Sequence, residues 1–260
     1  IGGPRQPERS PAEPVSLAAI WGGTTTVLDF ATQIPGHDIR HALDEAAERW
    51  KGNGYTDYSY HPIFTNGTSD EAVNQIPELI QEGFASFKIF TTSIRPPSPQ
   101  MQNNKTEFGT LASIMEKIAA NGGMLLVHSE DDDMVQHMYQ KLAREETTEW
   151  YNMHLVHSAE SEDVSFRRVL RVAEWTGAPV YFVHVSATQG LQAILEARSN
   201  GRPVYGETLH NYCCFSSDNY KEENGMKYHT YPSLKSEADR QSLWDGIVNN
   251  GLSTMATDEY

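Results

Sequence analysis

Short apolar runs alternate with amphipathic stretches along the chain. Seven apolar runs, rich in β-branched and aromatic residues, predict strands at residues 24–30, 55–64, 86–90, 124–130, 179–186, 203–208 and 253–258. The stretches between them predict helices at residues 39–50, 69–81, 106–120, 160–176, 189–198 and 236–249, with another beginning near Asp131 and an irregular insert at 209–234. Repeated strand–helix alternation predicts an α/β fold with a parallel sheet.

The number of strands favours a barrel. Seven strands in one series make up most of an eight-stranded (β/α)8 TIM-type barrel, and 260 residues suffice for one large domain. An open doubly wound sheet is the alternative, but no glycine-rich phosphate loop follows the first strand. We therefore treat residues 1–260 as one barrel domain.

Charge and cysteine content narrow the classes of partner. The net charge of −15 argues against binding to nucleic acid or to an anionic membrane. No apolar run approaches the roughly 20 residues that a membrane-spanning helix needs. Because the only two cysteines, Cys213 and Cys214, are adjacent, they do not form a loop-closing disulfide. Reduced thiols and a cytoplasmic location are expected.

One lysine, Lys88, lies in the middle of the apolar strand 86–90. A buried ammonium group is costly unless it is paired, neutralised or chemically changed. Three interpretations are open. The side chain snorkels to a nearby carboxylate, or it forms a Schiff base with a carbonyl substrate, or it carries CO₂ as a carbamate and binds metal.

Polar side chains collect where the predicted strands end. Four of them come from four different strands: Lys88, His128, His184 and Asp258. In a barrel, the carboxyl ends of the strands meet at one rim, which carries the function. Imidazole and carboxylate groups bind zinc and similar ions, and a lysine can join them only as a carbamate. A metal site explains the histidines, whereas a Schiff-base lysine does not.

The same segments resemble a known enzyme family. They are residues 22–26 with Asp29 and Phe30, then 86–90, 127–130, 183–186, 206–208 and 257–258. In this order and spacing, the chain resembles the hydantoinase/dihydropyrimidinase branch of the amidohydrolase superfamily over nearly its whole length.

The resemblance implies an amidohydrolase-like (β/α)8 barrel that opens a small cyclic amide or ureide ring. It implies two divalent metal ions, most often zinc, bridged by N6-carboxylated Lys88 and by the attacking hydroxide. By the same carry-over, His128 and His184 hold the second metal, while Asp258 binds the first metal and transfers the proton. A homo-oligomer, either a dimer or a tetramer, is also expected. Glu207 is expected to support the rim by hydrogen bonding. For the linker histidines His154 and His157, two interpretations stay open: a solvated face, or a supporting role at the rim.

Three departures from the family pattern matter. No His-x-His pair, which holds the first metal in the family, occurs in the sequence. Ser93 stands where the family has a tyrosine that helps to hold the oxyanion, and Tyr231 replaces a serine at a substrate-binding strand end. These two positions remain the expected substrate contacts. We expect a barrel that lacks its first strand and the small β-domain, with an open seam and incomplete metal binding.

A second interpretation comes from another class of protein. The same branch includes non-enzymatic scaffold relatives, which assemble as tetramers and have lost metal ligands. Here the four candidate ligands are all present, and this favours an enzyme.

Overall fold

The fold is built on a single parallel sheet. The computed structural model describes residues 12–34, 36–96 and 104–258. Seven strands pair in chain order, each with the next. They are β1 (Thr26–Thr32), β2 (Asp57–Ile63), β3 (Ser86–Phe90), β4 (Met124–His128), β5 (Val180–Phe182), β6 (Val204–Leu209) and β7 (Thr254–Ala256). The α/β class and all seven predicted strands are confirmed, with ends shifted by up to four residues.

Helices connect successive strands, as parallel pairing requires. They are α1 (Ala12–Trp21), α2 (Ile39–Trp50), α3 (Asp70–Asn74), α4 (Ile76–Gln81), α5 (Phe108–Asn121), α6 (Asp132–Arg144), α7 (Met153–Val156), α8 (Ala159–Thr176), α9 (Thr188–Ser199), α10 (His210–Cys214) and α11 (Glu237–Val248). The predicted helix at 69–81 is split at Gln75, because Pro77 lies in the first turn of α4 and has no N–H to continue the earlier helix. Within the described ranges, no helix has both the length and the apolarity to cross a membrane.

The predicted irregular insert is more ordered than expected. Besides α10, it contains the short 3₁₀ helices Ser217–Lys221 and Gly225–Tyr228, and a third 3₁₀ helix, Trp150–Asn152, precedes α7. The ring of Tyr220 is fully buried, and its hydroxyl accepts a hydrogen bond from the Leu234 backbone N–H at 2.8 Å. Tyr212, Tyr220 and Leu234 belong to the same hydrophobic core as residues of the sheet, so the insert is packed against it.

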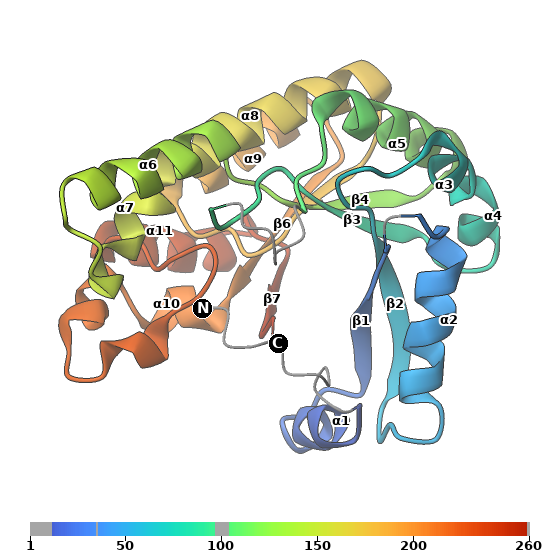
Figure 1. The fold of residues 1–260 in the computed structure, drawn as a ribbon, viewed down its shortest axis with the longest axis horizontal. Helices are drawn as coiled ribbons and strands as arrows, with labels where there is room; N and C mark the ends of the chain where they lie inside the picture. The colour runs from blue at the N-terminus through green and yellow to red at the C-terminus, as the bar shows by residue number, and fades with distance from the viewer. Residues whose placement is uncertain (1–11, 35, 97–103, 259–260) are drawn as a thin grey trace.

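The sheet is curled but open between its first and last strands. β1 pairs with β2 from Thr26 to Thr32, and β7 pairs with β6; among the described residues, β1 and β7 do not pair with each other. Figure 1 shows these two strands at the edges of the curled sheet, with α5, α8 and α9 along its outer side. Leu28 on β1 and Met255 on β7 are 50% and 45% exposed. The expected open seam is confirmed for the described part of the chain.

The alternation of side chains along β3 directs its lysine away from the helices. Phe87 and Ile89 are fully buried in the main hydrophobic core, together with Ile114 of α5. Successive side chains of a strand point to opposite faces of the sheet. Lys88 and Phe90 alternate with Phe87 and Ile89 along β3 and therefore face the opposite side of the sheet, which is its inner, concave side.

Candidate functional site

Lys88 is buried, and the part of the chain that the structure describes offers it no counter-ion. Its residue is 3% exposed, and its Nζ lies 5.3 Å from the ring centroid of Phe30 and 5.2 Å from that of Phe90. With the described residues it forms no ion pair, so snorkelling to a carboxylate does not explain it. Burial lowers the pKa of Lys88 to about 8, although the charges of Asp258 and Glu207 oppose this change. At neutral pH a useful fraction of the amine is therefore uncharged and nucleophilic.

Two histidines lie side by side next to this lysine. His128 ends β4 and His184 follows β5, and the two residues are 2% and 3% exposed. Their ring centroids are 4.4 Å apart, with an edge-to-face angle of 71°. Burial lowers the pKa of both imidazoles. Both rings are consequently neutral at pH 7, which is the form that binds metal ions.

The predicted strand at 179–186 ends early, at Phe182. His184 has a φ of 43°, a left-handed conformation that a strand cannot contain. After this turn, the Val185 N–H donates to the carbonyl of Glu207 at 2.7 Å. The turn brings the imidazole of His184 against that of His128.

Asp258 differs from the other three candidates in its exposure. It is exposed, follows β7 with a φ of 49°, and acts on Lys88 through its charge. Within the described ranges, no group of three His, Cys, Asp or Glu side chains is arranged to hold a metal ion. The charge of Lys88 acts in turn on both His128 and His184.

A buried glutamate that sequence reasoning missed holds one of these histidines. The Glu130 side chain is fully buried, and its carboxylate accepts hydrogen bonds from His128 Nε2 and His157 Nδ1, both at 2.8 Å. Burial opposes ionisation of Glu130, but the two histidines outweigh this effect and lower its pKa well below the ordinary value. Because an ionised carboxylate only accepts, His128 carries its proton on Nε2 and leaves Nδ1 as the ligating atom.

Glu207 forms the expected hydrogen bond, and of the two linker histidines His157 is buried against Glu130, whereas His154 contacts the nearby Tyr151 carbonyl. The Tyr181 hydroxyl donates to the Glu207 carboxylate at 2.8 Å. Burial raises the pKa of Glu207, whereas Tyr181 and Lys88 act in the opposite direction. His157 Nε2 lies 3.3 Å from the Tyr139 hydroxyl, on the side of the ring opposite Glu130. Tyr139, His157, Glu130 and His128 thus form one polar layer, and Tyr181 and Glu207 form a pair of their own.

The two expected substrate contacts lie near this layer and are half-buried. The Tyr231 ring packs edge-on against His157, with centroids 5.0 Å apart, and the Arg95 guanidinium lies 5.1 Å from its centroid. The backbone N–H of Ser93 donates to the Asp132 carboxylate at 2.9 Å. Their role in binding substrate stays a prediction.

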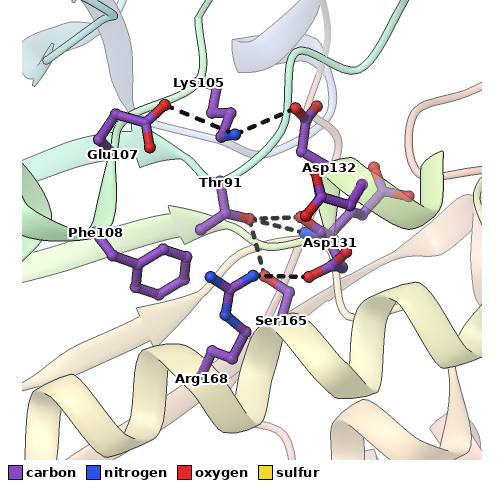
Figure 2. Close-up of a pocket in the computed structure, with 10 residues that line it drawn as sticks. Thr91, Lys105, Glu107, Phe108, Asp131, Asp132, Ser165 and Arg168 are labelled. Atoms are coloured by element: carbon purple, nitrogen blue, oxygen red, sulfur yellow. Dashed lines mark hydrogen bonds and ion pairs between the residues drawn. The ribbon is translucent and has the colours of Figure 1, made fainter. Parts of the chain in front are cut away.

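A polar pocket lies between the ends of β3 and β4 and helix α8 (Figure 2), and Glu130 is among the residues that line it. Several of its charged groups form ion pairs. The Lys105 Nζ lies 3.4 Å from Asp132 and 3.6 Å from Glu107, and Arg168 donates to Asp131 at 2.8 Å. These ion pairs stabilise the joint between α5, α6 and α8.

Comparison with known proteins identifies relatives over most of the chain. A D-hydantoinase of Streptomyces coelicolor is 35% identical over 244 residues, which is 93% of this chain and 50% of that protein. A D-hydantoinase of Geobacillus stearothermophilus is 28% identical over 247 residues, or 94% of this chain and 51% of that protein. A solved D-hydantoinase structure matches with a TM-score of 0.88 and 28% identity, covering 95% of this chain and 53% of the other. No protein-family model matches. The chain thus spans about half the length of the curated relatives it matches.

Proposed function

Because the chain is a homologue of the hydantoinase/dihydropyrimidinase branch of the amidohydrolases, we propose that the protein hydrolyses a ring amide of a small cyclic amide or ureide. The observation that carries this proposal is the juxtaposition of three groups: Lys88, which has no counter-ion among the described residues, and the neutral imidazoles of His128 and His184, on both of which the charge of Lys88 acts. This juxtaposition is hard to explain by packing alone, because a lone buried ammonium is costly.

The same residues fit a divalent metal ion such as zinc. A metal-binding histidine commonly donates its other ring N–H to a carboxylate, and His128 does so to Glu130. Lys88, once carboxylated, would add an anionic oxygen to the nitrogens of His128 and His184. Three protein ligands of this kind suit a catalytic zinc ion. When bound, the metal would polarise the ring carbonyl and activate water.

Side chains of the protein itself would carry out proton transfer and substrate binding. Water oxygen adds to the carbonyl carbon, and the ring C–N bond then breaks. Asp258 would take the proton of the water and deliver it to the leaving nitrogen. Tyr231 and Ser93 would contact the ring of the substrate. Phe30 and Phe90, which flank Lys88, keep bulk water from this side chain.

Activity assays on the full-length protein test the proposal directly. We expect the protein to open at least one ring among a panel of hydantoins and dihydropyrimidines, to lose this activity on treatment with a chelator, and to regain it with zinc. A folded full-length protein that binds no metal and opens no ring would contradict the proposal. It would favour the non-catalytic scaffold interpretation instead.

Alanine at either histidine should remove metal without unfolding the protein. For His128→Ala and His184→Ala we expect the loss of about one metal equivalent per chain, because each removes one of three ligands. Metal content by elemental analysis and the melting temperature of metal-free protein check this. His137→Ala, which changes an exposed histidine of α6, is the matched control. A large fall in melting temperature with unchanged metal content would show that the histidines serve the fold.

Carbamate formation on Lys88 should depend on pH in a way that ordinary lysines do not. With a pKa of about 8, about 3% of the amine is neutral at pH 6.5 and about 75% at pH 8.5, against about 1% at pH 8.5 for an ordinary lysine. At fixed dissolved ¹³CO₂, the carbamate signal of metal-free protein should rise steeply over this interval in NMR spectra. Lys88→Met should lack the signal, and an equal signal in that variant would contradict the assignment.

A further inference from the structure

The backbone at His184 is held in a conformation that the residue does not prefer. Its φ of 43° lies in the left-handed region, which is sparsely populated by residues other than glycine. A buried histidine keeps this conformation only if its surroundings determine it. On one side of His184, Val183 N–H donates to the Val127 carbonyl at 3.3 Å. The holding group on the other side comes from helix α8.

Glu162 binds the two residues that follow this turn. It lies in the first turn of α8 and is 1% exposed. Its carboxylate accepts the Ala187 N–H at 3.1 Å and the Ser186 N–H at 3.2 Å, and it also accepts the Ser186 hydroxyl in a short hydrogen bond. Three donors from two consecutive residues thus converge on one carboxylate.

The surroundings of Glu162 are shaped to receive it. A Cβ atom at Gly190 would lie 2.2 Å from Glu162 Oε1, so only glycine leaves room for the carboxylate. Burial raises the pKa of Glu162 to about 7, while the charge of the buried Lys235 and the hydrogen bonds from Ser186 and Ala187 act in the opposite direction. The Lys235 Nζ itself donates to the Ser233 carbonyl at 2.9 Å. Because a buried carboxylate is costly without such partners, the arrangement must serve a purpose that apolar packing would not.

We infer that Glu162 is a positioning residue, which holds the 184–187 turn so that the imidazole of His184 stays against that of His128. This inference rests on the proposed metal-dependent function, because His184 must be held in place only if it is a metal ligand. It assigns a role to a residue that touches neither substrate nor metal ligand side chains. Glu162 and Glu130 would then each fix one histidine, the first through the backbone and the second through the ring.

The test is Glu162→Gln in full-length protein, with Glu160→Gln, an exposed glutamate of the same helix, as the matched control. Glutamine keeps the volume but presents N–H donors where the turn also presents donors. We expect zinc to bind at least about tenfold more weakly, as on loss of a supporting contact to a metal ligand. Amide hydrogen exchange of Ser186 and Ala187 should accelerate by about tenfold or more at a temperature where the variant is folded.

Gly190→Ala provides a second route, because the added methyl group displaces the carboxylate without removing it. It should weaken zinc binding and speed the same two amides. If both variants only lower the melting temperature, with zinc affinity and amide exchange of the folded protein unchanged, the inference is wrong and the proposed function stands. If the unaltered protein binds no zinc, the proposed function fails. Amide exchange then still decides whether Glu162 holds the turn.

Discussion

Replacing Lys88 by alanine is expected to reduce kcat/KM for ring opening by about 10²–10³-fold, the scale seen when one preorganised electrostatic group is removed from an active site. The carboxylated lysine is proposed to act as a metal ligand on a tether, and alanine removes both the ligand and its charge. The metal content of the full-length protein should fall in parallel. Short carboxylic acids such as acetate should restore part of the activity and of the metal, because they supply the same oxygen ligand without the tether.

Two further variants separate chemistry from folding. Lys88→Met fills the buried space beside Phe30 and Phe90 and removes the buried charge. It should therefore be as stable as the unaltered protein but as inactive as Lys88→Ala. Lys227→Ala changes an exposed lysine and should leave activity unchanged. Full activity and full metal content in Lys88→Met would refute the proposed role. Trapping of a carbonyl compound on Lys88 by borohydride would assign a Schiff base to it instead.

Replacing Glu130 by alanine is expected to lower the free energy of unfolding by about 3–6 kcal/mol, because it removes two buried hydrogen bonds to a charged carboxylate, each contributing about 1.5–3 kcal/mol. It leaves His128 and His157 without the carboxylate that both of them contact at 2.8 Å. For a chain of this size, the melting temperature should fall by about 6–24 °C. Glu116→Ala, at an exposed site on α5, should change it little. An unchanged melting temperature in Glu130→Ala would contradict the account of this network.

The same network predicts how stability depends on pH. The pKa of Glu130 is well below that of an ordinary glutamate, so the folded state binds this proton less readily than the unfolded state does. Its contribution is therefore complete above about pH 4.3 and is lost as the pH falls below that value. Between pH 6 and pH 3, the difference in unfolding free energy between the unaltered protein and Glu130→Gln should shrink. A difference that stays constant over this range would show that Glu130 is not ionised in the fold.

Much of the fold could be predicted because each element has a strong local pattern. The run 86–90 is apolar and β-branched or aromatic around one lysine, and it forms β3 with the expected bounds. The strand predicted at 179–186 could not be bounded correctly, since nothing in its apolar sequence reveals the left-handed turn at His184. That turn depends on contacts with Glu162 and Glu207, which lie on other elements.

The candidate site could be predicted only in part, for a related reason. Strand ends identify Lys88, His128 and His184, because parallel strands bring their carboxyl ends to one rim. The roles of Glu130 and Glu162 rest on contacts that join residues 24 to 27 positions apart. In the sequence, Glu162 is an acidic residue near a helix start, where the helix dipole alone would favour it. The contact between His128 and Glu130 is the exception, because the two residues are only two positions apart in the sequence.

The most direct test of the central claim is X-ray diffraction at the zinc absorption edge from crystals of full-length protein grown with zinc and bicarbonate. The account predicts an anomalous peak within about 2.0–2.1 Å of His128 Nδ1 and of a ring nitrogen of His184. It also predicts electron density for a carboxylate group extending from Lys88 Nζ toward the peak. An unmodified Lys88 between the rings of Phe30 and Phe90, with no anomalous peak between the two histidines, would contradict it.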